Sequence, residues 1–206
     1  MSARKKSQTG KSADPDIAAG SGTTAGPGKT AVPGKMAVPG KMAGPGKTAG
    51  PIDLYRITKE RYAEDLSGTG ARRYGGRWNN RGVPVVYTAE HRSLSLLEFL
   101  VHAPPQVLPA GMCMLAIRIP ADVPVYDLTT GELPAGWRGY PYDSLTQEIG
   151  DTLLKSDKYG LIRVPSAIVE EERNCLIHPG LALEAGVFVR EVKPLYLDGR
   201  LLPDER

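Results

Sequence analysis

Hydrophobic and polar positions follow regular patterns only after residue 50. Short apolar runs rich in β-branched residues predict strands at 52–58, 83–89, 112–119, 124–128, 160–166, 175–179 and 187–197. Longer periodic segments predict helices at 91–102 and 143–158, with a short helical turn at 61–66. Because helices and strands do not alternate regularly, the pattern disfavours a doubly wound parallel sheet. It predicts an α+β fold with a mainly antiparallel sheet and few helices.

Residues 1–50 differ in composition from the rest of the chain. They contain no Trp, Tyr, Phe or Leu, and a hexapeptide near-repeat (PGKTAV, PGKMAV, PGKMAG, PGKTAG) begins at Pro27, Pro33, Pro39 and Pro45. Such a segment buries too little apolar surface to offset the entropy of ordering it. Frequent Pro and Gly also oppose both helix and strand. We therefore predict a disordered tail at 1–50 and one folded domain at 51–206.

The net charge divides at the same boundary. Residues 1–50 carry eight basic and two acidic side chains, a net charge of +6, whereas the rest carries 18 basic and 21 acidic ones, a net charge of −3. The positive balance of the whole chain therefore describes the tail rather than the domain. A tail of this charge is compatible with weak contact to nucleic acid or to an acidic partner, and equally with a solubilising leader.

Cysteines and histidines give no sign of a disulfide or a metal site. Cys113 and Cys175 lie far apart in apolar stretches, which is typical of buried thiols, and the histidines show no ligand spacing. No apolar run approaches the length of a membrane span, and no signal peptide is recognisable. The expectation is a cytoplasmic protein without a bound metal or a membrane anchor.

The stretch from Tyr74 to Gly82, YGGRWNNRG, has neither helical nor strand periodicity and is predicted to be a loop. A solvent-exposed turn has no use for Trp78, and a core segment would be destabilised by Arg77 and Arg81. The combination indicates a binding loop, in which backbone, cation and aromatic ring face a ligand.

The helix at 91–102 carries a candidate functional carboxylate. Leu94, Leu97 and Val101 are predicted to form one apolar stripe, and Glu98 falls on the same stripe, four residues after Leu94. A carboxylate at the edge of an apolar face is costly unless a partner or ligand receives it. A side chain that reaches sideways to water fits the pattern equally well, so Glu98 alone does not establish a site.

Other polar residues also allow both a structural and a functional interpretation. Arg56 shares a strand face with Leu54, and it either lies on a solvated edge or grips an anion through its planar donors. Tyr87 ends a strand and by default completes the core, although its ring could stack on a flat ligand. Ser166 and Asn174 fit turn or cap positions. Ser166 lacks the Gly-x-Ser-x-Gly context and the His partner of a serine hydrolase.

Taken in order, several segments resemble the RES domain family, which is named for an arginine, a glutamate and a serine. They are LYRI, SGTGARRYGGRWNNRGVPVVYTAE, LLEFLVH, VPSAIV with ERNCLIHP, and the closing strand, and together they span about residues 52–197. The run GARRYGGRWN followed by a VVYTAE strand is a specific signature. Residues 1–50 lie outside the resemblance.

The resemblance implies a fold similar to that of ADP-ribosyltransferases. It also implies an activity that consumes NAD, by hydrolysis, by phosphorolysis or by transfer of ADP-ribose to a protein. RES proteins are typically toxins of bacterial toxin–antitoxin pairs, neutralised by an Xre-type antitoxin with a helix-turn-helix domain. Carried over by position, the candidate site residues are Arg56, Arg77, Tyr87, Glu98 and Ser166.

The implied roles follow from cleavage of the nicotinamide–ribose bond, which builds positive charge on the ribose. Glu98 would stabilise that charge or bind a ribose hydroxyl. Tyr87 would stack near the nicotinamide ribose, and Ser166 would orient the nicotinamide side or the ribose. No metal is required, because nicotinamide is already a good leaving group.

The remaining roles concern the loop and the first strand of the domain. Arg56 and Arg77 would bind the pyrophosphate of NAD, aided by the bare backbone at Gly75 and Gly76. Trp78 is expected to anchor the loop to the core, and the arginine at position 81 to face solvent.

Three functional hypotheses follow. The favoured one is a toxin that destroys NAD, and the second is an ADP-ribosyltransferase that labels a particular protein through the same site. The third is a non-enzymatic module that binds nucleic acid through the tail. The domain lacks a basic, aromatic-rich surface pattern, which disfavours the third hypothesis. Contact with nucleic acid is therefore expected only indirectly, through the antitoxin.

Overall fold

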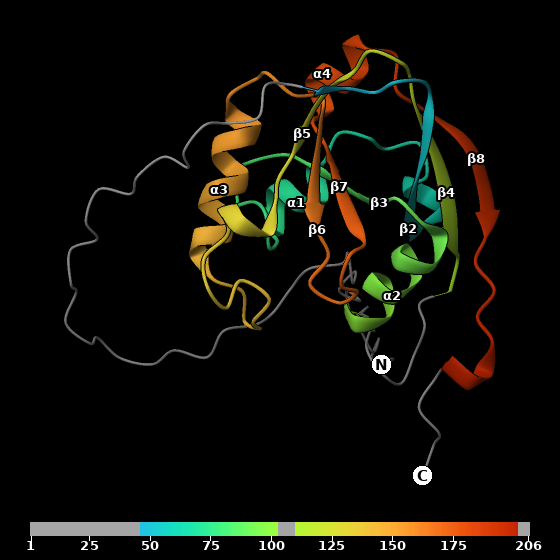
Figure 1. Ribbon diagram of the computed structural model, residues 1–206. Helices are drawn as coiled ribbons and strands as arrows, with labels where there is room; N and C mark the ends of the chain where they lie inside the picture. Colours follow the sequence, from blue (N-terminus) through green and yellow to red (C-terminus); the bar gives the residue numbers. More distant parts are fainter. Residues whose placement is uncertain (1–45, 103–109, 202–206) are drawn as a thin grey trace, which may run out of the picture.

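The computed structural model describes residues 46–102 and 110–201 (Figure 1). The strands are β1 (Gly46–Lys47), β2 (Ile52–Lys59), β3 (Val86–Ala89), β4 (Met112–Ile119), β5 (Pro124–Asp127), β6 (Leu161–Pro165), β7 (Arg173–Ile177) and β8 (Phe188–Pro194). The helices are α1 (Thr69–Tyr74), α2 (Arg92–His102), α3 (Ser144–Lys155) and α4 (Pro179–Glu184), with 3-10 turns at Glu60–Tyr62, Thr130–Glu132 and Gly199–Leu201.

The described strands form a single sheet in the order β1-β5-β6-β7-β3-β2-β4-β8. Its neighbouring strands are antiparallel except β5 and β6, which are parallel. The parallel pair is joined through α3, because parallel neighbours need a long crossover connection. The predicted α+β fold with a mainly antiparallel sheet is therefore confirmed.

The sheet opens between its two halves, where β2 and β3 meet. All of β2 pairs with β4, from Ile52 opposite Ile119 to Lys59 opposite Met112. With β3, in contrast, β2 shares only the pair Tyr55 and Ala89. The two strands diverge beyond this pair, so residues 56–59 of β2 do not pair with β3. This divergence makes room for a cleft within the fold.

Two helices cover the face of the sheet that carries Tyr55 and Ala89. Near β2 and β4, Phe99 of α2 packs with Ile57 and Met114. Over β5, β6 and β7, α3 contributes Leu153 and Leu154 to a second core, which also contains both tryptophans. Figure 1 shows α2 and α3 at separate ends of the sheet, with α1 and the following loop between them. The opposite face packs into a third core with Ala63, which follows the 3-10 turn Glu60–Tyr62, and with Ala182 of α4.

The apolar stripe predicted for α2 is wrong in part. Leu94 is buried, but Leu97 is 41% exposed and Val101 is 62% exposed. The buried face instead contains Leu94, Ser95 and Phe99. The helix packs on β2 and β3 through the face that carries Leu94, Ser95 and Phe99. Glu98 is therefore turned toward the space between the strands rather than into the core.

Two short helices and one strand were not predicted. Helix α1 and helix α4 have six residues each, which is too short for an apolar period to be visible. The helical turn predicted at 61–66 is a single 3-10 turn at Glu60–Tyr62. Strand β1 lies inside the predicted tail, and the prediction for residues 1–45 lies outside the described residues.

The folded part of the chain begins before residue 51. Gly46 and Lys47, in the last copy of the hexapeptide repeat, pair with Val125 and Pro124 of β5. Thr48 is 4% exposed; its Oγ1 donates to the Pro120 carbonyl at 2.9 Å and accepts from the Val123 N–H at 3.2 Å. Sequence composition misplaced this boundary because pairing with β5, and not local propensity, orders these residues.

Replacing Thr48 by valine is expected to lower the free energy of unfolding by about 2 kcal/mol, because a buried N–H loses its acceptor. Urea denaturation measures the change. Thr152→Val, at an exposed threonine of α3, is the matched control and should change stability much less. Equal stabilities of the two variants would show that residues 46–48 are not part of the cooperative unit.

Candidate active site

A cleft of about 620 Å³ lies where β2 and β3 diverge. Its walls come from β2, the segment from α1 to Trp78, helix α2, and a segment that contains Arg138, Tyr140 and Tyr142. The sequence-predicted residues that line it are Arg56, Gly75, Gly76, Arg77, Tyr87 and Glu98. The fold therefore brings these residues to one cleft from elements far apart in the chain.

The Glu98 carboxylate is held at one oxygen by two neutral donors. The Ser166 hydroxyl donates to Oε1 at 3.1 Å, and the Asn174 side-chain amide donates to the same atom. Oε2 has no hydrogen-bond partner among the described residues, and Glu98 lines the cleft. Glu98 is therefore fixed within the protein rather than extended into water, and one of its oxygens remains open to the cleft.

Ser166 is 1% exposed and does not itself line the cleft. Its Oγ accepts from the N–H groups of Ile168 and Val169, both at 3.1 Å, so its single hydrogen is directed to Glu98. Direct orientation of a ligand by this hydroxyl, as the sequence suggested, would require these contacts to break. In this geometry Ser166 acts on a ligand only through Glu98.

Arg77 is fixed by the segment opposite its own loop. Its Nη1 donates to the carbonyl groups of Trp137 and of Gly139, the latter at 3.1 Å, and its guanidinium lies 5.6 Å from the ring centre of Tyr142. Burial lowers the pKa of Arg77, while the nearby Glu98 carboxylate raises it. An arginine remains protonated after such a shift, so the cleft contains a fixed cation close to a fixed carboxylate.

The loop that carries Arg77 is pinned by the hydroxyl of Tyr87. This hydroxyl accepts from the Trp78 N–H at 3.0 Å and donates to Asn79 Oδ1 at 2.8 Å. Burial raises the pKa of Tyr87, so the hydroxyl stays protonated and keeps both contacts. Tyr87 also packs against the second core and lines the cleft, so its position is compatible with both interpretations left open by the sequence.

The glycines before Arg77 permit a close approach of the backbone. Gly75 has φ +76°, and a Cβ on Gly76 would lie 2.6 Å from the Tyr87 hydroxyl. Their N–H groups already donate to the carbonyl groups of Ala71 and Asn79. These glycines therefore shape the wall of the cleft, and their N–H groups are not free to bind phosphate as they stand.

Trp78 and Arg81 also lie as expected from the sequence. Trp78 is 2% exposed and packs with Trp137 at a ring-centre distance of 6.0 Å, so it anchors the loop to the core. Arg81 is exposed, and its Nε contacts the Tyr74 carbonyl.

Arg56 lines the cleft from β2. It follows Leu54 on the same face of β2, at the position where β3 has already separated from β2. Its Nη1 donates to the Asp65 carbonyl at 3.0 Å, in the turn that precedes α1. Arg56 and Arg77 thus both line the cleft, Arg56 from β2 and Arg77 from the loop after α1.

Sequence reasoning missed Asn174 and the segment that contains Trp137, Arg138, Tyr140 and Tyr142. Asn174 was assigned a turn or cap, but it lies in β7 between Ala89 and Val164. The missed segment, WRGYPY, shares its mixture of glycine, arginine and aromatic residues with YGGRWNNRG. This composition would have predicted a second binding loop at 137–142.

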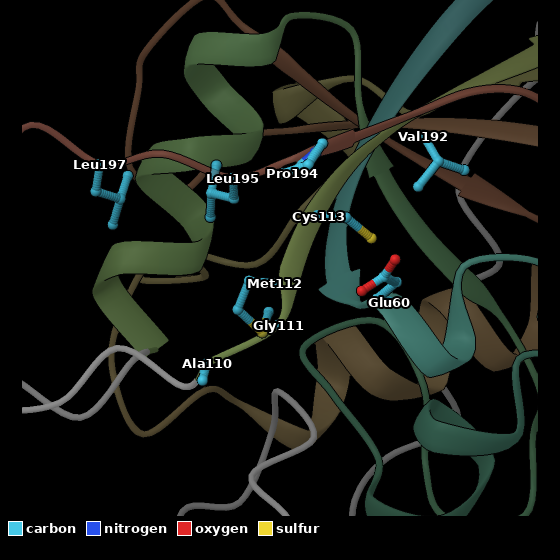
Figure 2. Close-up of a pocket in the computed structure, with 9 residues that line it drawn as sticks. All are labelled: Glu60, Ala110, Gly111, Met112, Cys113, Val192, Pro194, Leu195 and Leu197. Atoms are coloured by element: carbon cyan, nitrogen blue, oxygen red, sulfur yellow. The ribbon is translucent and has the colours of Figure 1, made fainter.

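A second, smaller hollow of about 320 Å³ lies beside β4 and β8 (Figure 2). Figure 2 shows the Cys113 sulfur pointing toward the Glu60 carboxylate, among apolar side chains that include Met112 and Leu195. Burial raises the pKa of the Cys113 thiol. With a carboxylate and no cation in its lining, this hollow does not suit a phosphate-bearing ligand.

Two further features concern metal ions and membrane spans. Across residues 46–102 and 110–201, no group of three or more His, Cys, Asp and Glu side chains is placed to hold a metal ion. Over the same residues, every helix is too short or too polar to cross a membrane.

Comparison with known proteins identifies the family. The model of the RES domain matches residues 53–197. The Prs ADP-ribosylating toxin of Sphingobium sp. (strain YBL2) is 38% identical over 142 residues, 68% of this chain and 88% of that protein. Toxin Res of Photorhabdus laumondii subsp. laumondii is 40% identical over 154 residues, 72% of this chain and 96% of that protein.

The fold has a counterpart among solved structures. It is similar to a chain in the crystal structure of the M. tuberculosis MbcT–MbcA toxin–antitoxin complex, with a TM-score of 0.58 and 21% identity over 72% of this chain and 86% of that chain. At this identity the likeness concerns the fold alone. The sequence matches carry the assignment: the chain belongs to the RES domain family.

Proposed function

We propose that the protein is the toxin of a toxin–antitoxin pair and that its cleft binds NAD and cleaves the nicotinamide–ribose bond. The observation that carries the proposal is the fixed Glu98 carboxylate, which keeps one oxygen open to a cleft that also contains Arg56 and Arg77. The curated relatives, which are named as toxins and in one case as ADP-ribosylating, support the same assignment.

The proposed reaction breaks the bond between C1 of the ribose and the ring nitrogen of nicotinamide. The bonding electron pair leaves with nicotinamide, which becomes neutral, and positive charge develops on the ribose. The Glu98 carboxylate stabilises this charge. When water is the acceptor, its oxygen bonds to C1 and a proton is released, which gives ADP-ribose. Phosphate as acceptor gives ADP-ribose 1″-phosphate instead.

The arginines would bind the pyrophosphate that joins the two halves of NAD. A guanidinium forms strong, charge-assisted hydrogen bonds to phosphate oxygens. Arg77 has one nitrogen committed to carbonyl groups of the WRGYPY segment. Its other nitrogens remain to donate to a ligand, with the guanidinium already oriented by those carbonyl groups.

Replacing Arg77 by alanine should raise the KM for NAD at least tenfold, which corresponds to about 1.4 kcal/mol. Steady-state kinetics of nicotinamide release measures the effect. Arg81→Ala is the matched control, because Arg81 belongs to the same loop but faces solvent, and its KM should equal that of wild type. A similar KM in all three proteins would remove Arg77 from the proposed site.

A second function, transfer of ADP-ribose to a specific protein, uses the same cleavage with a protein side chain as acceptor. It is favoured by the name of the Sphingobium relative, a Prs ADP-ribosylating toxin. Incubation with NAD labelled in the adenylate portion, with and without phosphate and a bacterial protein extract, separates the acceptors. Label in ADP-ribose or its phosphate indicates destruction of NAD, whereas label on a protein band indicates transfer.

The proposed partner is an Xre-type antitoxin with a helix-turn-helix domain, and any contact with nucleic acid would run through that protein. The toxin–antitoxin complex that shares this fold is consistent with such a partner. The domain itself is acidic, so direct binding of nucleic acid by the domain is disfavoured. The proposed site of action is the cytoplasm, where NAD is available.

A further inference from the structure

The amide of Asn174 has one orientation that the site permits. An ionised carboxylate only accepts hydrogen bonds, so the contact with Glu98 requires the amide nitrogen of Asn174 to face it. The Ser166 hydrogen is directed to the same oxygen, because Ser166 Oγ already accepts two backbone N–H groups. Oε1 of Glu98 therefore receives two donors, whereas Oε2 receives none from the described residues.

Both donors to Glu98, the Asn174 amide and the Ser166 hydroxyl, belong to residues whose backbone is fixed by hydrogen bonds. Asn174 lies in β7, which is hydrogen-bonded to β3 on one side and to β6 on the other, with Ala89 and Val164 as its neighbours. Ser166 follows the end of β6, and its N–H donates to the Glu172 carbonyl at 2.9 Å. The Glu98 carboxylate of α2 is thus held by residues of the sheet. These contacts fix the distance of the carboxylate from β3 and its rotation.

We propose that Asn174 is a positioning residue that, together with Ser166, saturates Oε1 of Glu98 and so reserves Oε2 for the substrate. This inference rests on the proposed function. Two donors on one oxygen prevent the carboxylate from rotating, and they leave Oε2 as the atom that meets the ribose. Preorganisation of this kind favours the transition state over the bound substrate. Loss of the amide should therefore lower kcat more than it raises KM.

The first test is Asn174→Ala, assayed by nicotinamide release from NAD. We expect kcat to fall about tenfold, with less than a twofold change in KM. Thr48→Val is the control for general destabilisation, since Thr48 is also buried and hydrogen-bonded but lies away from the cleft. It should lower the thermal midpoint and leave both kinetic constants unchanged.

Asn174→Asp supplies a readout that a merely structural role would not move. Two carboxyl groups at hydrogen-bond distance share a proton, so their apparent pKa is raised, and the shared form again places a donor on Glu98. Activity relative to wild type should rise as the pH falls through this raised pKa and be lost above it. The other charged or titratable side chains that line this cleft are the same in both proteins: Arg56, Lys59, Asp65, Arg73, Arg77, His102 and Arg138, with Tyr55, Tyr62, Tyr74, Tyr87, Tyr140 and Tyr142.

The outcomes separate this inference from the proposed function. No release of nicotinamide by the wild-type protein would reject the proposed function. Release by wild type, with an unchanged kcat for Asn174→Ala and a pH profile for Asn174→Asp parallel to that of wild type, would reject the role of Asn174 alone. A lower kcat together with the acid-shifted profile supports it.

Discussion

Replacing Glu98 by glutamine is expected to reduce the rate of nicotinamide release at least a hundredfold, a loss of about 3 kcal/mol of transition-state stabilisation. Glutamine has the same shape, and its carbonyl oxygen can accept from Ser166 and Asn174 as Oε1 does. The neutral amide then stands where the charge on the ribose develops. The free energy of unfolding should therefore change little, and denaturation in urea checks this.

Glu148→Gln is the control for the loss of one negative charge, because Glu148 is exposed on α3 and its side chain has no role in the cleft. Its nicotinamide release should match wild type. If Glu98→Gln is folded and retains more than a tenth of the wild-type rate, charge stabilisation by Glu98 is not the basis of the reaction.

Replacing Gly150 by alanine is expected to lower the free energy of unfolding by about 3 kcal/mol, although alanine is the better helix former. A Cβ at Gly150 would lie 1.9 Å from the Trp78 carbonyl oxygen and 2.8 Å from its carbonyl carbon. Both contacts are with backbone, so no side chain can move to relieve them. The clash would push α3 away from the loop that carries Arg77, and NAD binding should weaken as well.

Gly70→Ala is the matched control for this variant. Gly70 is also helical, in α1, and a Cβ there would meet nothing within 4 Å. Its free energy of unfolding should equal or slightly exceed that of wild type. Thermal and urea denaturation of both variants measure these changes in the free energy of unfolding. Equal stability of Gly150→Ala and wild type would mean that α3 and the loop are not in the contact that the structure gives them.

Most of the longer strands were predictable because the domain buries them in apolar runs, although β8 is mostly exposed. Strand β4, for example, is buried along most of its length and matches the predicted bounds 112–119. Strand β1 escaped prediction because two residues of a Pro/Gly/Lys repeat form a strand only by pairing with β5. Helix α4 carried a local signal, a proline at its first turn after the capping His178, which could have been used.

Within the candidate site, the chemistry of single residues was easier to predict than their partners. Glu98 stood out as a carboxylate on a helix with apolar neighbours, but the stripe that framed it was misassigned, since Leu97 and Val101 are exposed. Nothing in the local sequence of Asn174 indicates that β7 faces α2. That relation arises from sheet order and from the divergence of β2 and β3, which are long-range properties.

The most direct test of the account is the release of nicotinamide by the purified wild-type protein. NAD labelled in the nicotinamide ring is supplied with phosphate and a bacterial protein extract, so that every proposed acceptor is present, and free nicotinamide is measured over time. We expect release of many nicotinamide molecules per protein molecule, abolished by Glu98→Gln. A folded wild-type protein that releases no nicotinamide above the buffer control under these conditions would contradict it.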